Sequence, residues 1–338
     1  MRAVLAIAVN AYREAVRDRV LIGVVGVAAA SLLFGMSLAW LSLTEQVRIV
    51  VDHGIVTMSW LANVVAIFLG ASFLYKEIEL RTLYVILSKP LSRWQFVAGK
   101  YVGIVATAIV FNLITGSMLL VLLDLQTAEA RGVAGAGLAS LTRQLTTSRP
   151  ARALVIVAGA ALILLVLRFV VRSARARALR DAIGGAMSGV FALVIFGLCA
   201  LMARQVAPVE TRFVVYATVL VSAEVCITAA IAMLFSSFST PFVTGLLTFG
   251  AFLAGRSAGA MLELRGRQLP AGLRDAMHRI AAVIPNLQVF VPSRSGLLPG
   301  EPGIGVGVFL AQATAYAGLY SIVLLVAAMA LFRRRDLT

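Results

Sequence analysis

Long uncharged apolar runs recur along this chain, and they constrain its fold more than any other feature. Runs of about 20 such residues are long enough to cross a bilayer. Backbone groups in lipid must be hydrogen-bonded within the segment, so these runs predict helices rather than strands. The composition is 61% hydrophobic and 13% charged over 338 residues. Since soluble proteins expose only small apolar patches, the sequence predicts an all-α polytopic membrane protein.

We expect a single transmembrane domain with about eight spans, preceded by an interfacial helix in residues 1–19. In that helix Leu5 and Val9 lie on one face, whereas Arg13 and Arg17 lie on the other, which is typical of a helix in the membrane interface. The expected spans are Val20–Leu43, Gly54–Tyr75, Tyr101–Leu123, Ala153–Val171, Ala182–Ala203, Phe213–Phe235, Phe242–Ala254 and Ile304–Phe332.

The distribution of positive charge indicates the orientation of these spans. The formal net charge is +15, and the basic residues gather in short loops that alternate with loops of mixed charge. Cytoplasmic loops carry the excess of Lys and Arg, so both termini are expected in the cytoplasm. The segment 256–303 then lies outside the cytoplasm. Because the chain has no long basic tail and no alternation of aromatic and basic residues, we expect no nucleic-acid binding.

The stretch Lys76–Lys100 is the most polar part of the chain. It holds five basic and two acidic residues, including all three lysines, between two expected spans. A helix up to Pro90 would place Glu77 four residues before Arg81, so that the two can pair. The helix would also carry an apolar stripe, formed by Leu80, Leu83, Tyr84 and Leu87. Two interpretations remain: a docking helix for a soluble partner, or an ordinary cytoplasmic loop.

Motifs for catalysis or cofactor binding are missing from the sequence. The only Gly-Lys pair, Gly99-Lys100, lacks the earlier glycine and the Ser or Thr of a P-loop. No GxSxG or HExxH pattern occurs, and the two cysteines lie inside apolar runs. We therefore expect no catalytic, cofactor-binding or metal-binding residues, and no enzyme activity in this chain.

Glu224 is the one acid deep inside an expected span. A charge at the membrane centre costs about 2.5–3.5 kcal/mol on insertion scales, so it needs an interior position or a partner. Glu224 either lines a translocation route or joins a dimer contact, or it is structural. In the structural case it is protonated, or hydrogen-bonded to Ser222 or Thr228.

The segment YKEIELRTLYVILSKPLSRWQFVAGKYVG resembles the first cytoplasmic loop of ABC-2 type permeases, the membrane subunits of ATP-driven exporters. Within that group the chain is most similar to gliding-motility and copper-enzyme-maturation permeases. The stretches YREAVRDRVL, LFSSFSTPFVTGLLTFGAFLAG, IPNLQVF and FRRRDL resemble further family segments in the expected order. The resemblance covers about 1–123 and 213–338. Family members usually have six spans, so the pair in 153–203 is an addition, expected to pack on the outside.

The resemblance implies a coupling helix at Lys76–Ser88 that docks into a separate nucleotide-binding subunit, which would bind ATP and Mg. The implied docking residues are Lys76, Glu77, Glu79, Arg81, Leu83 and Tyr84. A second, smaller contact is implied at the turn Ser236–Pro241, through Ser236 and Ser237. Serines are also common where a helix simply ends, which is the alternative interpretation.

The resemblance further implies an exporter subunit in the bacterial inner membrane, in contact with lipid and paired as a homodimer or heterodimer. Two alternatives from other classes remain open. The chain could be a secondary transporter driven by an ion gradient, or a membrane scaffold that transports nothing. The substrate, the accessory subunits and the role of the added pair cannot be read from the sequence.

Overall fold

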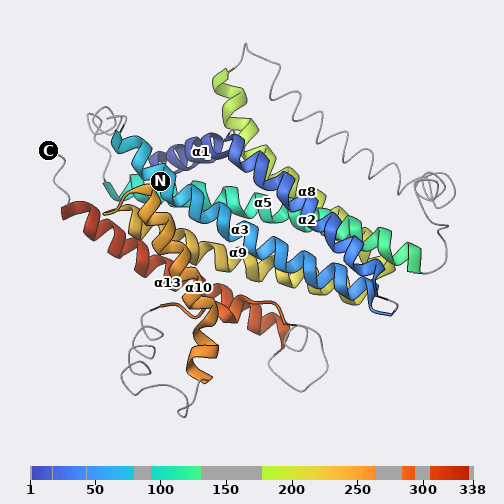
Figure 1. Cartoon of the computed structure of the whole chain (residues 1–338). Coiled ribbons are helices and arrows are strands. Elements are labelled where there is room, and N and C mark those ends of the chain that lie inside the picture. Colours follow the sequence, from blue (N-terminus) through green and yellow to red (C-terminus); the bar gives the residue numbers. More distant parts are fainter. Residues whose placement is uncertain are drawn as a thin grey trace. The chain divides into compact units, whose positions relative to one another are not determined.

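The computed structural model describes residues 2–16, 18–42, 44–79, 93–130, 177–263, 284–293 and 305–334. Every regular element in these ranges is helical, which confirms the all-helical class for this part of the chain (Figure 1). The elements are α1 (Arg2–Val16), α2 (Arg19–Trp40), α3 (Gln46–Glu79), α5 (Arg93–Ala130), α8 (Arg177–Val206), α9 (Pro208–Ser236), α10 (Pro241–Glu263), the 3-10 turn η1 (Leu287–Phe290) and α13 (Val306–Arg334).

Six of the described helices are long and apolar enough to cross a membrane, as expected for a multi-pass membrane protein. The qualifying segments are Val20–Trp40, Gln46–Ser72, Trp94–Thr127, Gly189–Val206, Pro208–Ser236 and Val306–Leu331. Each overlaps one of the expected spans. The expected span Ala153–Val171 lies outside the described residues, and the orientation of the termini remains a prediction.

The expected seventh span, Phe242–Ala254, lies in α10, which is not among these six helices, and its expected end was wrong. α10 continues to Glu263 and includes Arg256, which the sequence assigned to the outer segment 256–303. A lone arginine after an apolar run is typical of the end of a span. Here the helix continues because the guanidinium has an acidic partner within the fold.

The expected start of the second span, Gly54, was also wrong. α3 begins at Gln46, inside an expected outer loop, and runs without a break to Glu79. Its first turns are polar but stable, since Arg48 pairs with Glu45 at 3.8 Å and with Asp52 at 3.6 Å along the helix surface. The helix also continues past Tyr75, the expected end of this span, although its membrane-length segment ends at Ser72.

The chain divides into two compact units. Unit 1 is drawn from Met1–Val24, Ser59–Asn112 and Tyr216–Thr338, and unit 2 from Val25–Met58 and Leu113–Val215. In unit 2, α2 and α3 share a polar contact: the Ser31 hydroxyl lies 3.2 Å from Nε2 of His53 and 2.9 Å from Oγ1 of Thr57. Gly54 of the same unit lies directly against Leu119 of α5, where any larger side chain would collide.

In unit 1 the amphipathic helix α1 packs on the start of α5. A Cβ atom added to Gly99 would lie 2.7 Å from Cβ of Ile7, and one added to Gly103 would lie 2.6 Å from Cβ of Ala11. Small residues allow helices to approach this closely. The α1 face is correspondingly small, because Ala8, Ala11 and Ala15 are all buried.

The core of unit 1 surrounds α9, whose membrane-length segment is 72% buried. α5 is bonded to it at two levels. Nδ2 of Asn112 donates to the Thr218 carbonyl at 3.0 Å and to the Ser222 hydroxyl at 2.9 Å, and the Tyr101 hydroxyl donates to the Cys226 carbonyl at 3.1 Å. These bonds fix the side of α9 that faces α5 and leave its other buried side for α3 and α10.

The turn η1 holds the far end of α10. Gly255 lets the backbone of Pro285 and the buried side chain of Leu287 approach that helix closely. Phe290, also buried, stacks on Tyr316 of α13 with ring centroids 6.1 Å apart. α10, η1 and α13 thus form one packed group within unit 1.

Candidate functional site

A buried ion pair joins α9 to α10 inside unit 1. Nε of Arg256 donates to Oε1 of Glu224 at 2.9 Å, and its Nη2 lies 3.3 Å from Oε2. The Glu224 side chain is 0% exposed and that of Arg256 is 14% exposed. Hydrogen bonds between ionised groups in such a geometry are among the strongest in proteins.

Ser59 of α3 completes a three-helix arrangement around this pair. Its hydroxyl accepts a hydrogen bond from Nη2 of Arg256 at 2.6 Å and donates one to Oε2 of Glu224 at 3.0 Å. The hydroxyl therefore bridges the cation and the anion. Because Ser59 is itself buried, this contact is shielded from water.

A second polar contact lies one helical turn away. The Thr228 hydroxyl of α9 donates to Oδ1 of Asn63 in α3 at 2.7 Å, and Nδ2 of Asn63 donates to the Ser59 carbonyl at 2.9 Å. Asn63 and Thr228 are both 0% exposed. α3 and α9 are thus bonded at two successive levels, and the ion pair is the link that adds α10.

Two aromatic rings flank the guanidinium of Arg256. Its Cζ lies 5.7 Å from the ring centroid of Trp60 and 5.3 Å from that of Phe252. The two rings meet edge to face, with centroids 5.5 Å apart. Aromatic faces attract cations, and the attraction increases when water is excluded.

These contacts make a neutral polar site within an apolar bundle. A lone charge at this depth would be costly, whereas an ion pair with further hydrogen bonds is tolerated. Removing one partner would leave the other charge buried without compensation. We name the set Ser59, Trp60, Asn63, Glu224, Thr228, Phe252 and Arg256 the polar cluster; it is the candidate functional site.

The structure answers the question of the Glu224 partner and corrects the expectation from sequence. The side chain does not bond to Ser222, whose hydroxyl donates to the Thr218 carbonyl, and Thr228 reaches only the Glu224 backbone carbonyl. The partners are Arg256 and Ser59. One sequence signal could have found Arg256, because it is the next charged residue after Glu224, 32 positions along the chain.

The two predicted docking serines end α9 and are buried. The Ser236 hydroxyl donates to the Met233 carbonyl at 3.0 Å, and the Ser237 hydroxyl donates to the Leu234 carbonyl at 2.6 Å. These bonds satisfy carbonyls at the helix end, which agrees with the interpretation that the two serines end the helix before Pro241. The exposed residues of this turn are Phe238, at 51% exposure, and Thr240. A docking role for the serines remains a prediction.

The other predicted docking residues fall at or beyond the limit of the described structure. Lys76, Glu77 and Glu79 lie in the last turns of α3, and their side chains are not described. Arg81, Leu83 and Tyr84 lie outside the described residues. Their role therefore remains a prediction.

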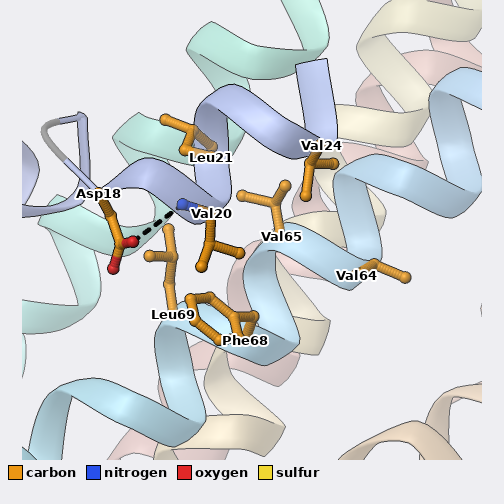
Figure 2. Close-up of a pocket in the computed structure, with 8 residues that line it drawn as sticks. All are labelled: Asp18, Val20, Leu21, Val24, Val64, Val65, Phe68 and Leu69. Atoms are coloured by element: carbon orange, nitrogen blue, oxygen red, sulfur yellow. Dashed lines mark hydrogen bonds between the residues drawn. The ribbon is translucent and has the colours of Figure 1, made fainter. Parts of the chain in front are cut away.

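One small apolar cavity lies between the start of α2 and α3 in unit 1 (Figure 2). Its volume is about 80 Å³. Asp18 is its single acidic residue, and one of its carboxylate oxygens accepts a hydrogen bond from the Val20 amide at 3.0 Å. The remaining lining residues are apolar: Val20, Leu21, Val24, Val64, Val65, Phe68 and Leu69. Its chemistry suits a short apolar group and brings no reactive side chains together.

The described residues contain no group of three His, Cys, Asp or Glu side chains placed to hold a metal ion. The polar cluster brings charge, hydrogen bonding and burial together within the described helices. A scan against protein-family models and a search of curated proteins found no match to this chain.

Proposed function

We propose that this chain is the permease subunit of an ABC-2 type exporter, driven by ATP that a separate nucleotide-binding subunit hydrolyses. The observation that carries the proposal is the segment Lys76–Lys100. Its sequence resembles the first cytoplasmic loop of that family, and it joins two long apolar helices, α3 and α5. In this proposal the chain itself performs no catalysis and binds no cofactor.

The packing of α1 on α5 supports such a coupling role. Lys100, where the charged segment ends, is buried, and its Nζ lies 3.9 Å from a carboxylate oxygen of Glu14 in α1. Gly99 and Gly103 bring the backbones of α1 and α5 together at the same place. A force applied to the charged segment would therefore reach α1 and α5 together.

Within the proposed cycle the helices of unit 1 carry the movement. ATP-driven closure of the partner subunits would press on the charged segment, and the α9–α10 turn would provide a second, smaller contact. The ion pair then links α10 to the same group of helices. We further propose a dimer of permease chains in the bacterial inner membrane, with the added helices of 153–203 on the outside. The low burial of Gly189–Val206, 11%, supports that placement.

Affinity purification of the tagged full chain from native membranes tests the proposal. A protein with a P-loop should co-purify, and its ATPase activity should depend on the presence of this chain. Leu83→Arg should leave the chain in the membrane but abolish co-purification, because an arginine would replace the packing anchor of the docking helix. Leu41→Arg is the matched control, since Leu41 is 82% exposed at the end of α2. Full co-purification with Leu83→Arg would refute the docking assignment.

The buried ion pair favours a second candidate, a transporter driven by an ion gradient, because such proteins use intramembrane acids. Unbroken helices argue against it, since α3, α5 and α9 run through their described lengths without interruption. Transport that continues after ATP is depleted would favour this alternative. A co-purified ATPase whose activity ignores this chain would instead indicate a scaffold.

A further inference from the structure

We infer that Arg256, flanked by Trp60 and Phe252, is a substrate-binding point that takes uncharged amphipathic molecules through a carbonyl oxygen, such as that of an ester or amide. The molecule would reach it sideways from the membrane interior. This inference rests on the proposed export function and narrows its substrate class. Three properties of the polar cluster support the inference: its hydrogen bonding, its exposure and its charge.

The guanidinium of Arg256 has N–H donors that no described residue accepts. It carries five N–H donors, and its contacts use Nε and Nη2. No residue that the structure describes accepts a hydrogen bond from Nη1. The side chain is 14% exposed, whereas its partner Glu224 is 0% exposed. An N–H donor that faces an apolar medium without an acceptor raises the free energy of the protein. The Nη1 side of the guanidinium therefore favours the binding of an acceptor oxygen.

The exposed surface beside this edge is apolar. On α10, Phe249 and Leu253 lie in helical register with Arg256 and are 38% and 40% exposed. On α3, Val64 lies one turn from Trp60 and is 37% exposed. A molecule that approaches across these residues brings an apolar body and a polar acceptor, which is the composition of a lipid-like substrate.

The charge of the cluster selects among possible acceptors. Glu224 already neutralises Arg256 at 2.9 Å. A carboxylate or phosphate on the substrate would add a second negative charge next to Glu224 in a medium of low dielectric constant, where like charges repel strongly. A carbonyl oxygen accepts from Nη1 without adding charge. The partly exposed ring of Trp60 then packs against the apolar part next to the carbonyl, whereas Phe252, at 1% exposure, supports the guanidinium from inside the bundle.

Trp60 is a built-in reporter for this binding. Trp40→Phe and Trp94→Phe, both at exposed positions, leave it as the only tryptophan of the full chain. The purified chain is placed in bilayers of ether-linked phosphatidylcholine, which carry no competing ester carbonyl. Brominated probes that quench tryptophan on contact are then added: methyl 6,7-dibromooctadecanoate, the corresponding carboxylate, and 6,7-dibromooctadecane.

The ester should reach half-maximal quenching at a mole fraction about fivefold lower than the alkane, which is the effect of one hydrogen bond. The carboxylate should bind more weakly than the ester. Glu224→Gln with Arg256→Met removes both charges together and should abolish the advantage of the ester. Arg256→Lys keeps the positive charge that pairs with Glu224 but lacks the planar guanidinium, so it should reduce the advantage of the ester over the alkane. Arg48→Met, at an exposed position, is the control and should change nothing.

Equal quenching by ester and alkane would overturn the inference, as would strongest binding by the carboxylate. An ester advantage that survives in the Arg256→Met double variant would do the same. The experiment contains no ATPase, so its failure refutes the binding point alone. Loss of the co-purifying ATPase, by contrast, would refute the exporter proposal and leave the binding measurement standing.

Discussion

Nε of Arg256 lies 2.9 Å from Oε1 of Glu224, although 31 uncharged residues separate the two in the chain. Each residue alone would be a costly charge in a membrane-length bundle. Together they bond α9 to α10, and Ser59 bonds both to α3. This relationship determines which substitutions the bundle tolerates.

Replacing one partner of the ion pair should lower the unfolding free energy more than replacing both partners. Arg256→Leu leaves Glu224 buried and unpaired, and we expect a loss of about 3–5 kcal/mol in unfolding free energy. Arg256→Leu combined with Glu224→Leu should be within about 1 kcal/mol of the parent, since apolar pairs often replace buried ion pairs without loss. Denaturant titration in mixed micelles measures both. A double variant as unstable as the single one would contradict this account.

Much of the fold could be predicted from the sequence, and the misplaced helix ends have one physical cause. Apolar runs of span length predicted the membrane helices because burial in lipid acts on each segment separately. The expected spans began at Gly54, after the charged stretch that holds Arg48, and ended at Ala254, just before Arg256, although both of these charges are paired within the helices. A partner at helical spacing, such as Asp52, is visible in a sequence. A partner on another helix is not.

The candidate site could be predicted only in part for the same reason. Glu224 stood out because an acid within a span is costly wherever it lies. Ser59, Asn63 and Thr228 did not stand out, since single polar residues are common in spans. Their bonds depend on the rotation of α3 and α9 about their axes, which tertiary packing determines.

The contact between α3 and α9 should be sensitive to the size of one residue. A Cβ atom on Gly70 would collide with Ala232, so Gly70→Ala should destabilise the protein by about 1–3 kcal/mol, the usual cost of overpacking. Gly250→Ala is the matched control, because nothing lies within 4 Å of that position. In a helix the control should be neutral or stabilising by up to about 1 kcal/mol. Thermal unfolding of the two variants in the same detergent decides the point.

Asn63 and Thr228 should be energetically coupled across α3 and α9. A double-mutant cycle with Asn63→Leu and Thr228→Val should give a coupling of about 0.6 kcal/mol, the average for hydrogen bonds between membrane helices. Thr107 and Thr228 form the control pair, since the Thr107 hydroxyl donates to its own helix at Gly103. Additive effects at Asn63 and Thr228 would show that their 2.7 Å contact contributes no stability.

The attachment of α1 to α5 should depend on Gly103. Gly103→Leu would drive a side chain into Ala11 and the α1 backbone, so we expect α1 to detach while the spans stay folded. A cysteine at the buried position Ala8, in a chain whose two native cysteines are replaced by alanine, reports the change by reacting with maleimide. The reaction should accelerate at least about tenfold, since detachment exposes the thiol. Gly23→Leu, which meets open space, should leave the rate unchanged, and slow labelling in both variants would mean that α1 is held elsewhere.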